Sequence, residues 1–296
     1  MEATVATLKH IRKHKDRNRF NIDNLQDYCL SIIVGQHDFQ FCVTDTRKNR
    51  VLLLEDYIIQ GGDTPQQQLD AISRVYEDNS LINAAFWKEV KVCVKNRQFS
   101  LVPTPLFDLQ EAHNYLQLNA AYDPELDECL AYPHNQAKMT TTFAVPKPLA
   151  EFFQSKYPNG NLRIFHQSSA LLEGLLKFEG TSRQKTMFIF IDRFFLHISV
   201  VKNNGLEYYN IFPIRTSEDY IKYMLGVMQT LKMDQKTSRV VLQGFIRPQS
   251  NHHKFLQKYA RNTAFGRRPG NLKLSYDFDE VGEHQYFDLL NTYLCD

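Results

Sequence analysis

The chain has 296 residues and a net charge of +2, and 43% of its residues are apolar. This composition is that of an ordinary folded protein of about two domains, and it excludes a disordered or fibrous chain. The near-neutral charge argues against a globally basic nucleic-acid binder. No apolar run approaches the ~20 residues of a membrane span, and no signal-peptide stretch follows the basic N-terminus, so we expect a cytoplasmic protein.

The cysteines are odd in number and widely spaced, with no C-x-x-C pair among them. A zinc site or a disulfide framework needs closer pairs. We therefore interpret them as reduced residues, at least two of them inside apolar strand patterns. They are Cys29, Cys42, Cys93, Cys129 and Cys295.

The N-terminal segment differs in composition from the rest of the chain. Residues 8–20, LKHIRKHKDRNRF, carry six Lys or Arg against one Asp and few apolar side chains. We predict a flexible, solvated arm over residues 1–24. The alternative is a contact with phosphate groups, which would show as a steep salt dependence of binding.

The next part of the chain predicts a three-strand meander followed by a helix and two strands. Gly61 and Gly62 end the third strand, Thr64 is the predicted N-cap, Pro65 takes the first helical position, and Gln67 completes a capping box. The predicted strands cover residues 28–36, 38–45, 50–59, 89–95 and 98–103, and the helix covers 64–78.

The second half repeats this order. It begins with an apolar hairpin, as the first half does. Residues 32–43 align with residues 189–200 at a constant offset of 157, which indicates an internal duplication. Met224, Met228 and Met233 are spaced as core residues of the second helix, although such methionines can also line a partner groove. The predicted strands cover 186–192, 194–202, 206–214 and 238–246, with an NNG turn at 203–205 and a helix over 216–233.

The middle and the tail are less regular. The predicted helices cover residues 108–119, 147–158, 168–178, 253–262 and 283–294, and the predicted strands cover 128–133, 140–146, 161–166 and 272–278.

Two meanders, each followed by helices and further strands, resemble the plan of the actin, Hsp70 and sugar-kinase superfamily. More narrowly, the segments YCLSIIVGQHDFQFCVTD, RQFSLVPTPLF, NLRIFHQSSALLEGLL and MFIFIDRFFLHISVV are similar to an uncharacterised family of small actin-like proteins found mainly in Bacteroidota. The resemblance implies an α/β fold of two ribonuclease-H-like lobes, each a mixed five-stranded sheet with flanking helices. It places the lobes at residues 25–160 and 161–283, with a closing helix at 284–296.

The resemblance implies a nucleotide site with a known plan. In active members of that superfamily, the first strand of each hairpin ends in an aspartate that binds a magnesium ion or a water molecule of its coordination shell. A glycine-rich turn then lets backbone N–H groups reach the phosphates. Here the first copy has Gly35 at this position and Asp38 three residues later, whereas the second copy keeps Asp192. Phe194 and Phe195 fill the second turn, where small residues are expected.

Losing three or four charge-assisted hydrogen bonds of about 1.5–3 kcal/mol each would weaken a nucleotide site by about 6 kcal/mol, or ~10⁴-fold. We therefore predict that phosphate gripping is lost and that no cofactor is bound. The superfamily's adenosine-binding glycine pair is reduced to Gly244, which is followed by Phe245. Gly35, Asp38, Asp192 and Gly244 are thus the candidate residues of a degenerate nucleotide cleft.

The other candidate groups of catalytic or metal-binding residues are incomplete. A two-metal nuclease needs several converging carboxylates, and Asp192 alone cannot hold a metal pair. His10 and His14, or His252 and His253, lack a nearby Cys or Asp to complete a metal site, so none is predicted. Asp192 can instead cap a turn or pair with Arg193 or Arg215, and His197 can be a hydrogen-bonded core or edge residue.

A basic loop near the C-terminus has two interpretations. Its basic residues lie beside Tyr259 and Phe265, an arrangement that suits RNA or a phosphorylated ligand, and they also suit a solvated connection. They are Arg261, Arg267, Arg268 and Lys273.

The sequence favours a non-catalytic binding or scaffolding module that has lost nucleotide hydrolysis and holds a protein partner. One alternative is a divergent ATP-dependent phosphotransferase or ATPase, with magnesium, that uses Asp192 as metal or base residue and Gly244 at the adenine. A second is an RNA-binding protein that uses the basic arm and the Arg267–Arg268 loop. The partner and the oligomeric state are not indicated.

Overall fold

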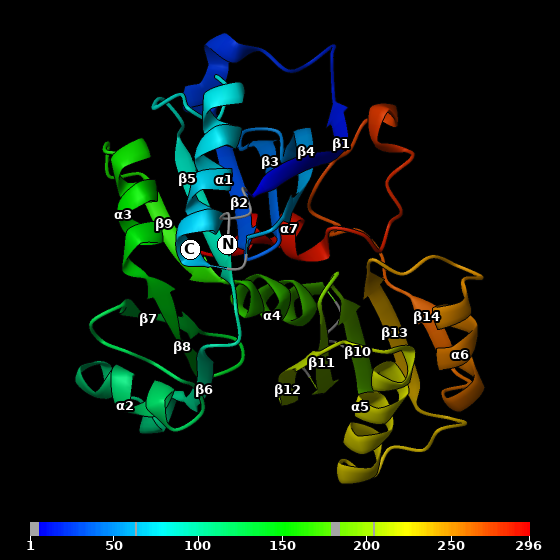
Figure 1. Cartoon of the computed structure of the whole chain (residues 1–296). Coiled ribbons are helices and arrows are strands. Elements are labelled where there is room, and N and C mark those ends of the chain that lie inside the picture. The colour runs from blue at the N-terminus through cyan, green and yellow to red at the C-terminus, as the bar shows by residue number, and fades with distance from the viewer. Residues whose placement is uncertain (1–5, 63, 179–183, 204) are drawn as a thin grey trace. The chain divides into compact units, whose positions relative to one another are not determined.

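The computed structural model describes residues 6–62, 64–178, 184–203 and 205–296. The chain divides into two compact units, which we call unit 1 and unit 2 (Figure 1). Unit 1 comprises Met1–Glu173, Asn271–Glu280 and Asp288–Asp296, and unit 2 comprises Gly174–Gly270 and Val281–Phe287. The division differs from the predicted one, because it falls near residue 173 and the last residues of the chain belong to unit 1.

Unit 1 contains a mixed six-stranded sheet. Three antiparallel strands are followed by two parallel ones, and a further antiparallel strand lies at the other edge. In order across the sheet the strands are β1 (Thr7–Lys15), β4 (Arg50–Gln60), β3 (Asp38–Asp45), β2 (Tyr28–Gly35), β5 (Glu89–Lys95) and β9 (Leu162–His166).

The central strands of this sheet are covered on both faces, since every residue of β2 and β3 is buried. On one face Tyr76 of α1 (Pro65–Asp78) packs edge-on against Phe39 and against Phe153 of α3 (Lys147–Lys156). On the other face Cys93 contacts Thr292 of the short helix η5 (Thr292–Leu294) at 3.4 Å. The predicted capping box of α1 is confirmed, because Thr64 and Gln67 exchange both hydrogen bonds.

A smaller three-stranded antiparallel sheet completes unit 1. Its strands are β6 (Phe99–Pro103), β8 (Met139–Pro146) and β7 (Asp127–His134), in that order. Helix α4 (Gln167–Phe178) continues the chain from β9. The remaining short helices are, in chain order, η1 (Ile22–Asp27), η2 (Thr104–Leu106), η3 (Leu109–Glu111), α2 (Ala112–Gln117), η4 (Tyr276–Phe278) and α7 (Phe287–Asn291).

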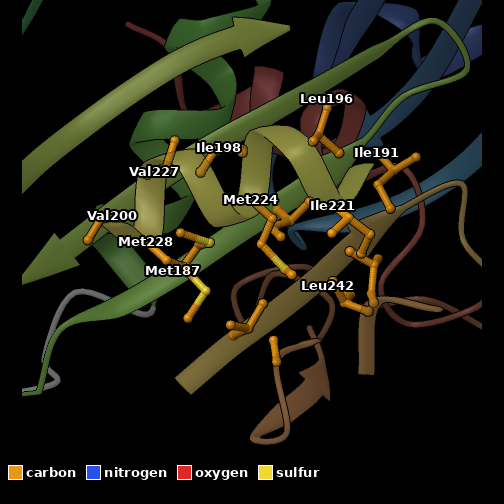
Figure 2. Packing of buried hydrophobic residues seen from close by; sticks show 14 of the residues in the cluster. Met187, Ile191, Leu196, Ile198, Val200, Ile221, Met224, Val227, Met228 and Leu242 are labelled. Atoms are coloured by element: carbon orange, nitrogen blue, oxygen red, sulfur yellow. The ribbon is translucent and has the colours of Figure 1, made fainter. Parts of the chain in front are cut away.

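Unit 2 contains a five-stranded mixed sheet with two helices. Its strands are β12 (Gly205–Pro213), β11 (Phe195–Lys202), β10 (Thr186–Ile191), β13 (Arg239–Gly244) and β14 (Thr263–Phe265), in that order, and its helices are α5 (Ser217–Thr230) and α6 (Asn251–Tyr259). Figure 2 shows Met187 of β10 gathered with Met224 and Met228 of α5 in the apolar core. The core interpretation of Met224, Met228 and Met233 is confirmed, because all three are buried in this cluster.

The two sheets share one strand order, if β1 is set aside. In unit 1 Leu30 pairs with Val43, and in unit 2 Met187 pairs with Val200, so the antiparallel registers agree at the predicted offset of 157. Each hairpin then adds a parallel neighbour to its first strand, β5 in unit 1 and β13 in unit 2. The hairpin equivalence inferred from the apolar pattern therefore holds at the level of individual residue pairs.

The predicted flexible arm is wrong for residues 7–15, which form the edge strand β1. This strand pairs with β4 from Thr7↔Gln60 to Lys15↔Leu53, with a bulge between His10 and Arg12. The backbone pairing orders the segment although its side chains are mostly polar, and it makes the first sheet six-stranded rather than five-stranded.

Two further predicted elements differ from the structure, and a third includes a residue that the structure does not describe. The predicted strand at 272–278 is instead an irregular segment that ends in η4 and makes a single bridge, Arg50↔Lys273. The closing helix is shorter than predicted and comprises α7 and η5. The predicted NNG turn includes Asn204, which lies outside the described residues.

The five cysteines are free, and four of them are buried. Burial raises the pKa of the Cys29 and Cys42 thiols to about 12. These two thiols are therefore protonated at neutral pH and unreactive.

Candidate functional site

The first hairpin turn, in unit 1, is closed by an ion pair. Asp38 is the first residue of β3, and its carboxylate lies 2.6 Å from the ammonium group of Lys95 at the end of β5. The side chains are only 1% and 4% exposed. Since lysine and aspartate are almost never buried unless they are paired, this contact is a structural requirement of the turn.

Gly35 makes room for this pair. A Cβ at Gly35 would lie 2.5 Å from a carboxylate oxygen of Asp38 and 3.1 Å from Cδ of Lys95. Gly35 stands beside Lys95 in the parallel register, and its carbonyl accepts a hydrogen bond of 2.7 Å from the Gln68 side chain. The Asp38–Lys95 pair thus fills the space beside Gly35, and any side chain at this position would require one of the two paired side chains to move.

The second hairpin turn, in unit 2, is closed by its own aspartate. One carboxylate oxygen of Asp192 accepts hydrogen bonds from the backbone N–H groups of Phe194 and Phe195, both at 2.7 Å. The Asp192 N–H in turn donates to the Phe195 carbonyl at 3.0 Å. These N–H groups occupy the positions from which a phosphate-binding turn would donate, and here a carboxylate of the same turn uses them.

The other Asp192 oxygen lies 3.3 Å from Nε2 of His197, and Nδ1 of His197 lies 2.9 Å from the Tyr209 hydroxyl. Asp192 and His197 are each 1% exposed. This arrangement matches the interpretation of Asp192 as a turn-capping acid and of His197 as a hydrogen-bonded core residue. Both Asp192 oxygens therefore have hydrogen-bond partners within unit 2.

Replacing Asp192 with alanine should lower the free energy of unfolding by about 3 kcal/mol, because two charge-assisted hydrogen bonds and the His197 contact are lost. Asp192→Asn should recover more than half of this loss, since its amide oxygen can still accept from the two backbone N–H groups. Urea unfolding of the two variants measures the difference. Equal losses in both variants would contradict the turn-capping role.

Glycine is required at position 244 because the backbones of the adjacent parallel strands β10 and β13 approach closely there. Its φ is +86°, and a Cβ would lie 2.1 Å from the Ile191 carbonyl oxygen. The Gly244 N–H donates to the His284 carbonyl at 2.7 Å, and the Phe245 N–H donates to the Ile191 carbonyl at 2.6 Å. Both N–H groups of this glycine turn are therefore engaged by the backbone of unit 2.

Two aromatic residues and a histidine surround this turn. The Arg193 guanidinium lies 4.2 Å from the centre of the Phe245 ring, and Tyr286 meets the same ring edge-on. Burial lowers the pKa of His284, whose Nε2 hydrogen-bonds the Ile246 carbonyl at 2.6 Å. Gly244 pairs with Ile191, the residue before Asp192, so these two candidate residues lie close together in unit 2, whereas Gly35 and Asp38 lie in unit 1.

Sequence reasoning missed two residues beside these turns. Lys95 ends a strand of alternating apolar residues, and its pairing with Asp38 follows only from the strand register. Gln243 precedes Gly244 and is fully buried, and neither of its amide atoms has a hydrogen-bond partner among the described residues. A glutamine inside the apolar run VVLQG was the available signal for Gln243.

The predicted basic residues divide between the two units. Arg261 and Arg267 are exposed, and the Arg268 guanidinium donates to the Val281 carbonyl, all within unit 2. Lys273 belongs to unit 1, where its backbone pairs with residues 49 and 51. Arg268 is thus tied to the backbone of its own unit, and the surface role of the four residues stays a prediction.

No group of three His, Cys, Asp or Glu side chains that could hold a metal ion occurs among the described residues. Within the same part of the chain, no helix is long and apolar enough to cross a membrane.

Comparison with known proteins identifies the family. Residues 17–263 match the family described as "Protein of unknown function (DUF3822)". The chain belongs to this family. A Bacteroides thetaiotaomicron protein of actin-like ATPase fold and unknown function is similar over 94% of this DUF3822 chain and 99% of its own, with a TM-score of 0.78 at 17% identity. No curated protein matches.

A second solved structure is the PilM–PilN type IV pilus biogenesis complex. One of its chains is similar over 90% of this chain and 97% of its own, with a TM-score of 0.57 at 9% identity. Both likenesses show the fold, which is actin-like as predicted. The predicted resemblance to a Bacteroidota family of small actin-like proteins is confirmed by the family match and by the Bacteroides structure.

Proposed function

We propose that this DUF3822 protein is a non-catalytic actin-like module that holds a protein partner and has lost nucleotide hydrolysis. The observation that carries the proposal is the capture of the Phe194 and Phe195 N–H groups by Asp192. A phosphate would have to displace a carboxylate from two hydrogen bonds of 2.7 Å. Because that exchange replaces one anion with another, the turn gains little by making it.

The first turn supports the same proposal. The ammonium group of Lys95 is neutralised by Asp38 at 2.6 Å, so the positive charge next to this turn is already compensated. The PilM–PilN complex supports it as well, because that complex contains a chain of similar fold together with a protein partner. The equivalent hairpins support an internal duplication, in which the second copy kept the acid and used it to close the turn.

Magnesium ATP at 1 mM should change the melting temperature by less than about 1 °C. A site with a Kd of about 10 µM would instead stabilise the protein by about 2.7 kcal/mol at that concentration and raise the melting temperature by several degrees. Differential scanning fluorimetry with and without magnesium ATP measures the shift, with magnesium alone as the control. A rise of several degrees, or ATP turnover that Asp192→Asn abolishes, would support the phosphotransferase alternative instead.

A further inference from the structure

Strand β1 presents an open edge of the six-stranded sheet. It lies first in the strand order, and within the described part of the chain its one strand neighbour is β4. Six of its nine residues are exposed. An edge strand of this length carries backbone N–H and C=O groups that can pair with an additional strand from another chain.

This edge is strongly basic in a chain whose net charge is only +2. Strand β1 carries four Lys or Arg and no acid, and the acid that follows it, Asp16, is buried and pairs with Arg19. Lys9 and Lys15 are exposed, and the Lys15 ammonium lies 4.4 Å from the centre of the Phe20 ring. Lysines on an edge repel ordinary neutral or basic strands, and they attract a strand that carries carboxylates.

The bulge at Ile11 sets which side chains share a face. Lys13 lies opposite Glu55 and pairs with it at 2.6 Å, and Lys15, two residues on, lies on the same face. Beside them the His10 ring contacts the Tyr57 ring in a tilted arrangement, with 4.8 Å between the ring centres. On this face Lys13 is already paired with Glu55, so a partner strand with an acid at every second residue would meet the ammonium group of Lys15.

We propose that β1 is a docking edge for an extended acidic segment of a partner protein, which adds to the sheet as a seventh strand. The inference rests on the proposed function and names the chemistry of the partner. A peptide strand fits better than single-stranded RNA, because the backbone N–H and C=O groups at the edge of a sheet form a hydrogen-bond ladder with a second peptide strand and not with a nucleic acid.

The test uses the full chain and a fluorescein-labelled ten-residue peptide in which Glu alternates with Val. Fluorescence anisotropy at 50 mM salt should show saturable binding that weakens at 200 mM salt. A peptide of equal charge with Pro at three of the Val positions should bind at least about tenfold more weakly, because proline cannot donate to a strand ladder. Equal binding of the two peptides would reduce the effect to charge attraction and overturn the proposal.

Lys15→Glu should weaken binding of the alternating peptide about fivefold, whereas Lys254→Glu on α6, also an exposed site but in unit 2, should leave the affinity unchanged. Circular dichroism confirms that both variants are folded. An unchanged affinity in Lys15→Glu, or displacement of the peptide by a lower concentration of oligo-uridine, would remove the acidic-strand assignment. If these binding tests fail, the proposed non-catalytic function still stands, because it does not depend on β1. ATP turnover would instead overturn the proposed function, and the peptide-binding result would not change.

Discussion

Replacing Lys95 with methionine should lower the free energy of unfolding by about 4 kcal/mol, because the Asp38 carboxylate would remain buried without its counter-charge. Removing one partner of a buried ion pair costs about 3–5 kcal/mol, far more than the pair itself contributes. Methionine keeps the length and apolar stem of lysine, so little of the loss comes from packing. Urea unfolding of unit 1, followed by a probe such as the buried Trp87, measures the change.

The double variant Asp38→Asn with Lys95→Met is the matched control. It removes both charges and keeps both shapes, so we expect it to be more stable than Lys95→Met by at least about 2 kcal/mol. A cycle that includes Asp38→Asn alone gives the coupling energy between the two residues. A loss below about 1 kcal/mol in Lys95→Met would show that the pair is hydrated and that the first turn is not closed by it.

The sequence predicted the strands of both hairpins because buried strands produce long apolar runs that are independent of partners. The run in β2 aligned with the run in β10 at a fixed offset, and the pairs Leu30↔Val43 and Met187↔Val200 confirm this alignment. The capping box at Thr64 was predictable for a similar reason, since both of its hydrogen bonds join residues three apart. Local signals of this kind need no knowledge of the tertiary structure.

Strand β1 could not be predicted in this way. Its nine residues, TLKHIRKHK, contain only Leu8 and Ile11 as apolar side chains, so no period of two is visible. The strand forms because β4 pairs with β3 along one edge only, and the backbone N–H and C=O groups of its other edge pair with residues 7–15. Strand propensity depends on the neighbouring strand, and here that neighbour is more than thirty residues away.

The candidate site was predicted in part. Asp192 was recognised as the acid at a strand end, and its turn-capping role was among the interpretations, because an aspartate can reach backbone N–H groups two and three residues on. The role of Lys95 was not visible, because Asp38 lies 57 residues earlier and only the parallel register of β2 and β5 brings them together. Long-range polar pairs of this kind leave no periodic signal.

Replacing Gly244 with alanine should lower the free energy of unfolding by more than about 4 kcal/mol, or prevent unit 2 from folding. Its φ of +86° is strained for any residue with a side chain, and the added Cβ would lie 2.1 Å from the Ile191 carbonyl oxygen. Because the obstacle is a backbone atom of the adjacent strand β10, no side-chain rotation can relieve it. Thermal unfolding and the yield of soluble protein measure the effect.

Gly226→Ala in α5 is the matched control in the same unit. No atom lies within 4 Å of the Cβ it would add, and the residue is an exposed glycine within a helix. Alanine there should therefore stabilise the protein by about 0.5–1 kcal/mol. If the free energy of unfolding of Gly244→Ala were within about 1 kcal/mol of that of the native chain, the backbones of β10 and β13 would not approach as closely as described. The N–H groups of the Gly244 turn would then be free to bind a ligand, and the argument against a nucleotide at that turn would fail.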